Sequence, residues 1–348
     1  MKKIFKVMLG VVMMLLMVNV SKADDKELIG AGATFPYPLY SKMFDVYYKE
    51  HGIKVNYSAI GSGGGIRQLK EKTVDFGGTD AFLSDQQIKE MGADIVHIPV
   101  CMGAVVLAYN MPGIKTLYLT PDIVADMFLG KIKKWNDPKI QKINPKEKLP
   151  DTNIVTVHRS DGSGTTFILT DYLSKISNEW QSKVGKGTSV NWPIGLGGKG
   201  NSGVAGLIKN VPYSIGYVEL IYALSNKIPF ATLQNKSGVF IEPSLTTTSK
   251  AGDVKLPDDM RVSITDTDAK DGYPISGFTW IIVYKEQNYG KNRSYERAKT
   301  LVNLLWWMVH QGQKYAEELH YAPLSKQALM KAENLIKSIT YNGKQIMN

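Results

Sequence analysis

Short apolar runs alternate along the chain with segments in which apolar residues recur every three or four positions, and glycine-rich turns separate the two. The short runs predict strands and the periodic segments predict helices. Strands that alternate with helices are typical of α/β proteins with parallel sheet. We expect strands at 55–60, 74–78, 105–109, 154–157, 214–218 and 278–284. We expect helices at 63–71, 122–129, 174–183 and 296–310. Residues 240–272 are polar and predict a surface excursion.

The first 23 residues have the pattern of a secretory signal peptide. Three lysines precede the apolar run 7–20, and the small residues Ser21 and Ala23 occupy the −3 and −1 positions of a cleavage site. The apolar run is short for a transmembrane anchor, which is the alternative reading of this pattern. We therefore expect cleavage after Ala23 and a secreted mature protein.

Composition narrows the classes of partner. The full chain of 348 residues has a formal net charge of +10, and the chain without residues 1–23 has +6. This mild basicity favours anions. No basic run interleaved with aromatic residues is present, so we expect no nucleic-acid partner. The single cysteine, Cys101, lies in an apolar run and is expected to be a buried thiol.

Four turns rich in glycine or hydroxyl residues are candidates for ligand binding. They lie at 30–36, 61–65, 77–80 and 159–166, and the last three follow predicted strands. Ligands of open α/β sheets bind beyond the carboxyl ends of strands. The turn from Arg159 to Thr166 combines an arginine, two glycines and four hydroxyls ahead of a predicted helix. Such donors at a helix start suit a small tetrahedral oxyanion.

Other chemistries fit the sequence less well. The third glycine of a dinucleotide fingerprint is replaced by Phe35 in one turn and by Ile66 in another, and the phosphate-loop pattern at 195–200 is incomplete. A nucleophile elbow around Ser163, with His158 as base, would need glycines where Asp161 and Thr165 stand. The five histidines lack the spacing of a metal site, so we expect no metal and no cofactor.

Each candidate donor also has a simpler structural interpretation. Arg159 offers a planar fork for anion oxygens and Asp161 would hold it, but the two residues also fit a surface ion pair. Ser62 offers donors at a helix start, but it also fits an ordinary N-cap. Thr34 and Phe35 offer main-chain N–H groups, whereas the Phe35 ring also fits the core.

Asp80 is unusual in an anion site because a carboxylate repels a fully ionised ligand. A carboxylate acceptor favours an anion that brings a proton, as phosphate does near neutral pH and sulfate does not. The simpler interpretation is that Asp80 caps a turn or the helix that begins near Ser84.

Taken together, these segments resemble the periplasmic phosphate-binding protein of the Pst-type ABC phosphate importer. The resemblance extends over nearly the whole mature chain. It is strongest in GAGATFP (30–36), YSAIGSGGG (57–65), VDFGGTD (74–80) and RSDGSGT (159–165). The segments 129–137, 192–201 and 215–219 support it further. Gly63 and Thr79 depart from the serines that relatives often have.

The resemblance implies an α/β protein with the class II periplasmic-binding-protein fold, in which crossing strands join two α/β lobes and the ligand lies in the cleft. Lobe one would comprise residues 24–105 plus 275–348, and lobe two residues 106–274. The implied phosphate ligands are Thr34, Phe35, Ser62, Asp80, Arg159, Ser163, Gly164 and Thr165. Asp161 would hold Arg159, and Asp80 would accept the phosphate proton.

The implied function is that of a periplasmic receptor, not an enzyme. It would deliver inorganic phosphate to inner-membrane ABC permease subunits with a cytoplasmic ATPase, and it would act as a monomer. The alternative is a secreted phosphatase or serine hydrolase that retains phosphate as product.

Overall fold

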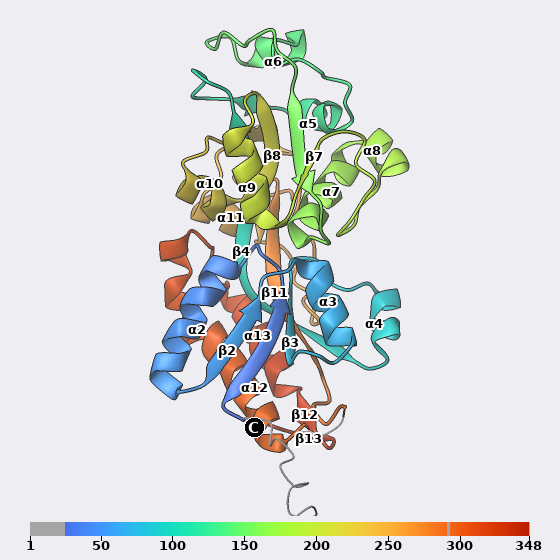
Figure 1. Cartoon of the computed structure of the whole chain (residues 1–348), viewed down its shortest axis with the longest axis vertical. Coiled ribbons are helices and arrows are strands. Elements are labelled where there is room, and N and C mark those ends of the chain that lie inside the picture. The colour runs from blue at the N-terminus through green and yellow to red at the C-terminus, as the bar shows by residue number, and fades with distance from the viewer. Residues whose placement is uncertain (1–24, 291–292, 348) are drawn as a thin grey trace, which may run out of the picture.

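The computed structural model describes residues 25–290 and 293–347. The signal peptide expected at residues 1–23 lies outside the described residues. Two α/β lobes are stacked along the long axis of the molecule (Figure 1). We call the part with β1–β3, α2–α4, α12 and α13 the first lobe, and the part with β5–β8 and α5–α10 the second lobe. Among the described residues, no helix has both the length and the apolar character needed to cross a membrane.

The first lobe alternates strands and helices at its start and adds helices from the end of the chain. Its first elements are β1 (Glu27–Gly32), α2 (Tyr37–His51), β2 (Lys54–Ser58), α3 (Ser62–Lys70), β3 (Phe76–Thr79) and α4 (Asp85–Met91). Its later elements are α12 (Tyr295–Val309), two 3₁₀ turns (Gln311–Tyr315 and Glu317–Leu319), α13 (Lys326–Lys337) and the hairpin β12 (Thr340–Tyr341) and β13 (Lys344–Gln345). The expected strand and helix positions in this lobe are confirmed to within a few residues.

The second lobe is a continuous middle segment. Its elements up to the strand of the Arg159 turn are β5 (Tyr118–Leu119), α5 (Pro121–Phe128), α6 (Pro138–Ile143) and β6 (Val155–Arg159). Those that follow are α7 (Gly164–Ile176), α8 (Asn178–Lys183), β7 (Leu196–Gly198), α9 (Gly200–Asn210), β8 (Ser214–Glu219) and α10 (Leu220–Asn226). The segment then continues through β9 (Thr232–Gln234), β10 (Phe240–Ile241) and α11 (Leu245–Ala251).

Two long strands, β4 (Ile95–Asn110) and β11 (Ser276–Tyr284), join the lobes into one eight-stranded sheet of order β2-β1-β3-β11-β4-β8-β6-β7. In this sheet β1 pairs parallel with β2 and β3, and β6 pairs parallel with β7 and β8, as expected from the alternating elements. The strand expected at 105–109 as part of that parallel rhythm pairs antiparallel with both of its neighbours, so this part of the prediction is wrong. The reason is that β11 arrives from the second lobe and inserts between β3 and β4 in the opposite direction.

The single helix expected at 174–183 is wrong. The chain forms α7 and α8 instead, and they are separated at Ser177, whose backbone is extended. The Ser177 hydroxyl accepts a hydrogen bond from the Trp180 N–H at 3.2 Å and caps α8. A serine whose side chain satisfies the first N–H groups of a new helix competes with continuation of the old one.

The surface excursion expected at 240–272 is also wrong for part of that segment. Leu256, Met260 and Ile264 are buried in a cluster with Trp280 of β11. The Trp280 indole N–H donates to the Met260 carbonyl at 3.0 Å. Isolated apolar residues in a polar segment therefore complete the core beside a crossing strand.

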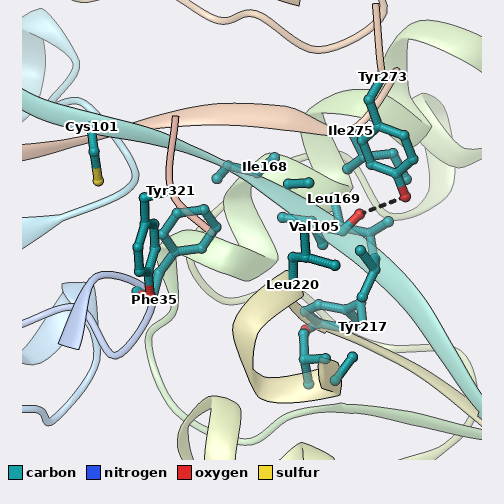
Figure 2. Packing of buried hydrophobic residues seen from close by; sticks show 14 of the residues in the cluster. Phe35, Cys101, Val105, Ile168, Leu169, Tyr217, Leu220, Tyr273, Ile275 and Tyr321 are labelled. Carbon is teal, nitrogen blue, oxygen red and sulfur yellow. Dashed lines mark hydrogen bonds between the residues drawn. The ribbon is translucent and has the colours of Figure 1, made fainter. Parts of the chain in front are cut away.

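The hydrophobic core continues from one lobe to the other (Figure 2). Val105 of β4 packs at the junction, and the Tyr273 hydroxyl donates to its carbonyl at 3.1 Å. Phe35 and Tyr321 lie side by side in the first-lobe part of this cluster, with ring centroids 6.3 Å apart. Cys101 is buried, as expected. The crossing strands thus hold the turns of the two lobes against each other.

Candidate functional site

The turns at the carboxyl ends of β1, β2, β3, β6 and β7 meet at the junction of the lobes. The Gly63 N–H donates to the Gly162 carbonyl at 2.9 Å, and the Gly164 N–H donates to the Ser62 hydroxyl at 3.0 Å. Figure 1 shows α3 and α7, which follow two of these turns, on the two sides of the junction. Because parallel strands end at the same edge of a sheet, turns that are distant in sequence converge there. The structure brings all eight predicted ligand positions to this junction.

Ser62 connects three of these turns. Its hydroxyl accepts hydrogen bonds from the Asp80 N–H at 3.3 Å and from the Gly164 N–H at 3.0 Å. It does not cap α3, whose N-cap is Gly61 without a side-chain hydrogen bond. Ser163, by contrast, caps α7, because its hydroxyl accepts from the Thr166 N–H at 3.0 Å. The N-cap interpretation thus applies to Ser163 and not to Ser62.

Arg159 and Asp161 form a buried bidentate pair. Nε of Arg159 lies 2.7 Å from Oδ1 of Asp161, and Nη2 lies 2.6 Å from Oδ2. The Arg159 side chain is only 1% exposed, so the pair is not a surface ion pair. Burial raises the pKa of Asp161, but the hydrogen bonds and charge of Arg159 outweigh it and leave that pKa below its usual value. Asp161 stays ionised and holds the guanidinium with its Nη1 directed toward Thr165 at 3.4 Å.

Asp80 is a buried carboxyl group among donors. Burial raises its pKa to about 7, although the Thr279 hydrogen bond, the charge of Arg159 and the Ser62 hydroxyl lower it in part. The Thr279 hydroxyl donates to Oδ1 at 2.8 Å. Helix α4 is capped by Ser84, so Asp80 does not act as its cap. A carboxyl group with this pKa exchanges a proton near neutral pH.

Thr34 and Phe35 form the turn that follows β1. Their carbonyl oxygens accept hydrogen bonds from the hydroxyls of Tyr222 at 2.5 Å and Tyr321 at 2.6 Å. Their own N–H groups donate to no acceptor among the residues at 25–290 and 293–347. The Phe35 ring is fully buried in the core, so its side chain anchors the turn. Both interpretations of Phe35 are therefore compatible, because the ring packs while the main chain stays available.

Sequence similarity to known proteins identifies the family of this chain. Residues 18–309 match the model of the PBP superfamily domain. The chain is 42% identical to the phosphate-binding protein PstS of Pasteurella multocida over 313 residues, 88% of this chain and 89% of that one. It is 43% identical to the phosphate-binding protein PstS of Haemophilus influenzae over 307 residues, 87% of this chain and 90% of that one. The chain belongs to the Pst-type phosphate-binding proteins.

Solved structures of the same fold are more distant in sequence. A DING protein has a TM-score of 0.72 at 18% identity, covering 91% of this chain and 99% of its own. A putative phosphate ABC transporter substrate-binding protein with bound phosphate from Clostridium perfringens has a TM-score of 0.62 at 16% identity. It covers 86% of this chain and 100% of its own. At these identities the likeness shows the two-lobed binding-protein fold, which confirms the expected fold class.

The site of this Pst-type chain contains residues to which the sequence assigned no role. Asn201 donates to the hydroxyls of Thr34 and Thr165, and Thr279 donates to Asp80. The Tyr217 hydroxyl accepts from the Arg159 N–H at 3.0 Å. These residues come from α9, β11 and β8. Asn201 and Tyr217 lie in the segments 192–201 and 215–219 that supported the family resemblance, whereas Thr279 was marked only as part of a predicted strand.

Among the described residues, serine hydrolysis and metal binding have no matching arrangement of side chains. The His158 ring stacks on Trp192 with centroids 4.9 Å apart, and its Nδ1 lies 3.0 Å from the Arg159 carbonyl. Within the described residues His158 has no hydrogen bond to Ser163. No group of three histidine, cysteine, aspartate or glutamate residues that could hold a metal occurs in the part of the chain that the structure describes.

Proposed function

We propose that this protein binds inorganic phosphate between its lobes and delivers it to an ABC-type phosphate import permease. The names of its relatives support the ligand, and the position of Asp80 is the observation on which the choice rests. Around Asp80 the junction presents the guanidinium of Arg159, hydroxyls and main-chain N–H groups, all of which favour an anion. In its ionised form this carboxyl group accepts hydrogen bonds only, so it favours an anion that brings a proton.

In this proposal the first lobe binds phosphate through Thr34, Phe35, Ser62 and Asp80, and the second lobe through Arg159, Ser163, Gly164 and Thr165. Arg159 supplies the permanent charge, and its pairing with Asp161 sets the direction of its remaining donors. Donors are more effective in this dry junction than in water, since the local dielectric constant is low. The hydrogen bond from the Gly63 N–H to the Gly162 carbonyl joins the two lobes, as closure around an anion requires.

The same proposal includes the remaining features of a receptor. Residues 1–23 act as a cleaved signal peptide and the mature chain works in the periplasm as a monomer without cofactor. Lobe one comprises 24–105 plus 275–348 and lobe two 106–274, a division supported by β4, which exchanges its partner β11 for β8 after Ala104. The partners are inner-membrane permease subunits with a cytoplasmic ATPase. Enzymatic activity is not part of the proposal, because Ser163 caps α7 and makes no hydrogen bond to His158 among the described residues.

Titration calorimetry with phosphate and sulfate tests the ligand. The wild-type protein is expected to bind phosphate tightly and sulfate negligibly at neutral pH. Asp80→Asn is expected to narrow that preference at least about tenfold, since an amide donates to sulfate. Asp45→Asn, on an exposed face of α2, is the matched control. Equal wild-type affinity for the two anions would overturn the argument, and turnover of a chromogenic phosphate ester that Ser163→Ala abolishes would favour the hydrolase.

A further inference from the structure

The three consecutive carbonyl groups of residues 33–35, in the turn that follows β1, each accept a hydrogen bond from a tyrosine hydroxyl. In the order of the acceptors, the donors are Tyr57 at 3.0 Å, Tyr222 at 2.5 Å and Tyr321 at 2.6 Å. Tyr57 on β2 and Tyr321 ahead of α13 belong to the first lobe, like the turn itself. Tyr222 belongs to α10 of the second lobe. Of the three bonds, only the one from Tyr222 therefore joins the lobes.

These hydroxyls remain protonated donors. Burial raises the pKa of each of the three tyrosines above its usual value. A carbonyl oxygen has no hydrogen, so it can only accept. Figure 2 shows Tyr321 beside Phe35, and the two rings pack in the core at a centroid distance of 6.3 Å. The turn is thus held by its carbonyl oxygens and by the Phe35 ring.

A hydrogen bond to a carbonyl also determines where the N–H of the same peptide points. The peptide group is planar, and in its trans form the C=O and N–H groups point in opposite directions. The peptide between Thr34 and Phe35 is trans. Its carbonyl accepts from Tyr222, and its N–H, that of Phe35, donates to no acceptor in the described part of the chain. The bond from Tyr222 fixes the direction of this N–H and polarises it, since hydrogen bonds in series strengthen one another.

The other two tyrosines differ from Tyr222 in one respect each. The carbonyl that accepts from Tyr321 shares its peptide with Pro36, which has no N–H to orient. The carbonyl that accepts from Tyr57 shares its peptide with the Thr34 N–H, but that bond lies within one lobe and does not depend on the approach of the other. Tyr222 combines an N–H-bearing peptide with a bond across the junction.

We propose that Tyr222 is a positioning residue of the phosphate site, which orients and strengthens the Phe35 N–H when the lobes close and thereby slows the release of phosphate. The inference rests on the proposed phosphate binding. Tyr222 and Thr34 belong to different lobes, so their hydrogen bond breaks when the lobes separate. Its contribution is therefore confined to the closed complex, and it acts on dissociation and not on the first encounter with the anion.

The rate of phosphate release tests the proposal. Release of radiolabelled phosphate into excess unlabelled phosphate gives the dissociation rate constant, and calorimetry gives the affinity. Tyr222→Phe is expected to release phosphate about tenfold faster and to bind it about tenfold more weakly, because it leaves a carbonyl unpaired in the closed junction only. Tyr321→Phe unpairs the next carbonyl of the same turn in both states, and it is expected to change release by less than about twofold. Tyr109→Phe is the control, since the buried Tyr109 hydroxyl has no hydrogen bond within residues 25–290 and 293–347.

The amide proton resonance of Phe35 distinguishes a positioning role from a simple contact between lobes. Phosphate is expected to move this resonance downfield in wild type and in Tyr321→Phe, and less far in Tyr222→Phe, because the N–H is a weaker donor there. Replacing Tyr222 by 4-aminophenylalanine keeps a weaker donor on the same ring. This variant is expected to release phosphate about threefold faster than wild type, between the wild-type and Tyr222→Phe rates.

The outcomes separate the two proposals. If the wild-type protein binds no phosphate, the proposed function fails. If it binds phosphate, but Tyr222→Phe releases it at the wild-type rate or shows the wild-type shift at Phe35, only the role of Tyr222 is overturned. Equal acceleration in Tyr321→Phe would overturn that role too, because order in the turn would then be the cause. Should Tyr222→Phe not fold, the 4-aminophenylalanine variant takes its place, and a wild-type release rate in that variant would overturn the proposal.

Discussion

Gly164 provides a sharp test of whether phosphate binding requires the closed junction. A methyl group added at Gly164 would lie 2.5 Å from Cβ and 2.5 Å from Oδ2 of Asp80, and 2.6 Å from Oγ of Ser62. Carbon atoms in contact lie about 3.5–4.0 Å apart, so the two lobes would have to separate locally by about 1 Å. The clash is between lobes, because Gly164 belongs to α7 and its neighbours belong to the first lobe.

A displacement of about 1 Å would break the contacts that close the junction. The bonds from Gly164 N to Ser62 Oγ at 3.0 Å and from Gly63 N to Gly162 O at 2.9 Å would lengthen beyond hydrogen-bonding distance. Losing two such bonds, together with weaker contact to the anion, corresponds to about 2–4 kcal/mol. We therefore expect Gly164→Ala to weaken phosphate binding roughly 30-fold to 700-fold.

The folding of the ligand-free protein should not suffer in the same way. Alanine is the better residue inside a helix, and the lobes can relax apart when no ligand holds them together. We expect the Tm of ligand-free Gly164→Ala to stay within a few degrees of wild type, while the increase in Tm on adding phosphate largely disappears. Gly206→Ala on α9 is the matched control, since a methyl group there meets no atom within 4 Å. Wild-type phosphate affinity in Gly164→Ala would refute the reasoning.

Two further predictions concern stability. Asp161→Asn removes the partner of the buried Arg159 and is expected to destabilise the protein by about 3–5 kcal/mol at neutral pH in urea denaturation. Because the folded-state pKa of Asp161 is lowered, its stabilisation is present above the unfolded pKa and is lost as the pH falls through the folded one. The difference between wild type and variant should therefore shrink in acid, and a constant difference would contradict the assignment. Met260→Ala is expected to cost about 2–5 kcal/mol while the exposed Lys255→Ala costs little, and equal effects would show that 240–272 is not part of the core.

The local sequence pattern was sufficient to predict the α/β fold class and the positions of the ligand-binding turns. Gly61, Ser62 and Arg159 stand where apolar strands give way to helices, and that pattern places donors at helix starts whatever the rest of the chain does. The family resemblance rested on such turns taken together and is confirmed. Asp80 was also recognisable from the sequence as an unusual residue, because a carboxylate beside anion-binding donors repels a fully ionised ligand.

Only the tertiary structure decided which groups share a site and what state they adopt. Burial raises the pKa of Asp80 to about 7 against the opposing hydrogen bond from Thr279, nearly two hundred residues away, and no local pattern predicts that burial. The orientation of the Thr34 hydroxyl depends on Asn201 in the other lobe, and so on how two strands cross. Periodicity reports only local conformation, and it also missed the antiparallel crossing of β11 and the buried Met260. Long-range pairing and burial arise when distant segments pack, and they turn a set of candidate donors into one buried junction in which Asp161 is paired with Arg159 and Asp80 is held by hydroxyl groups.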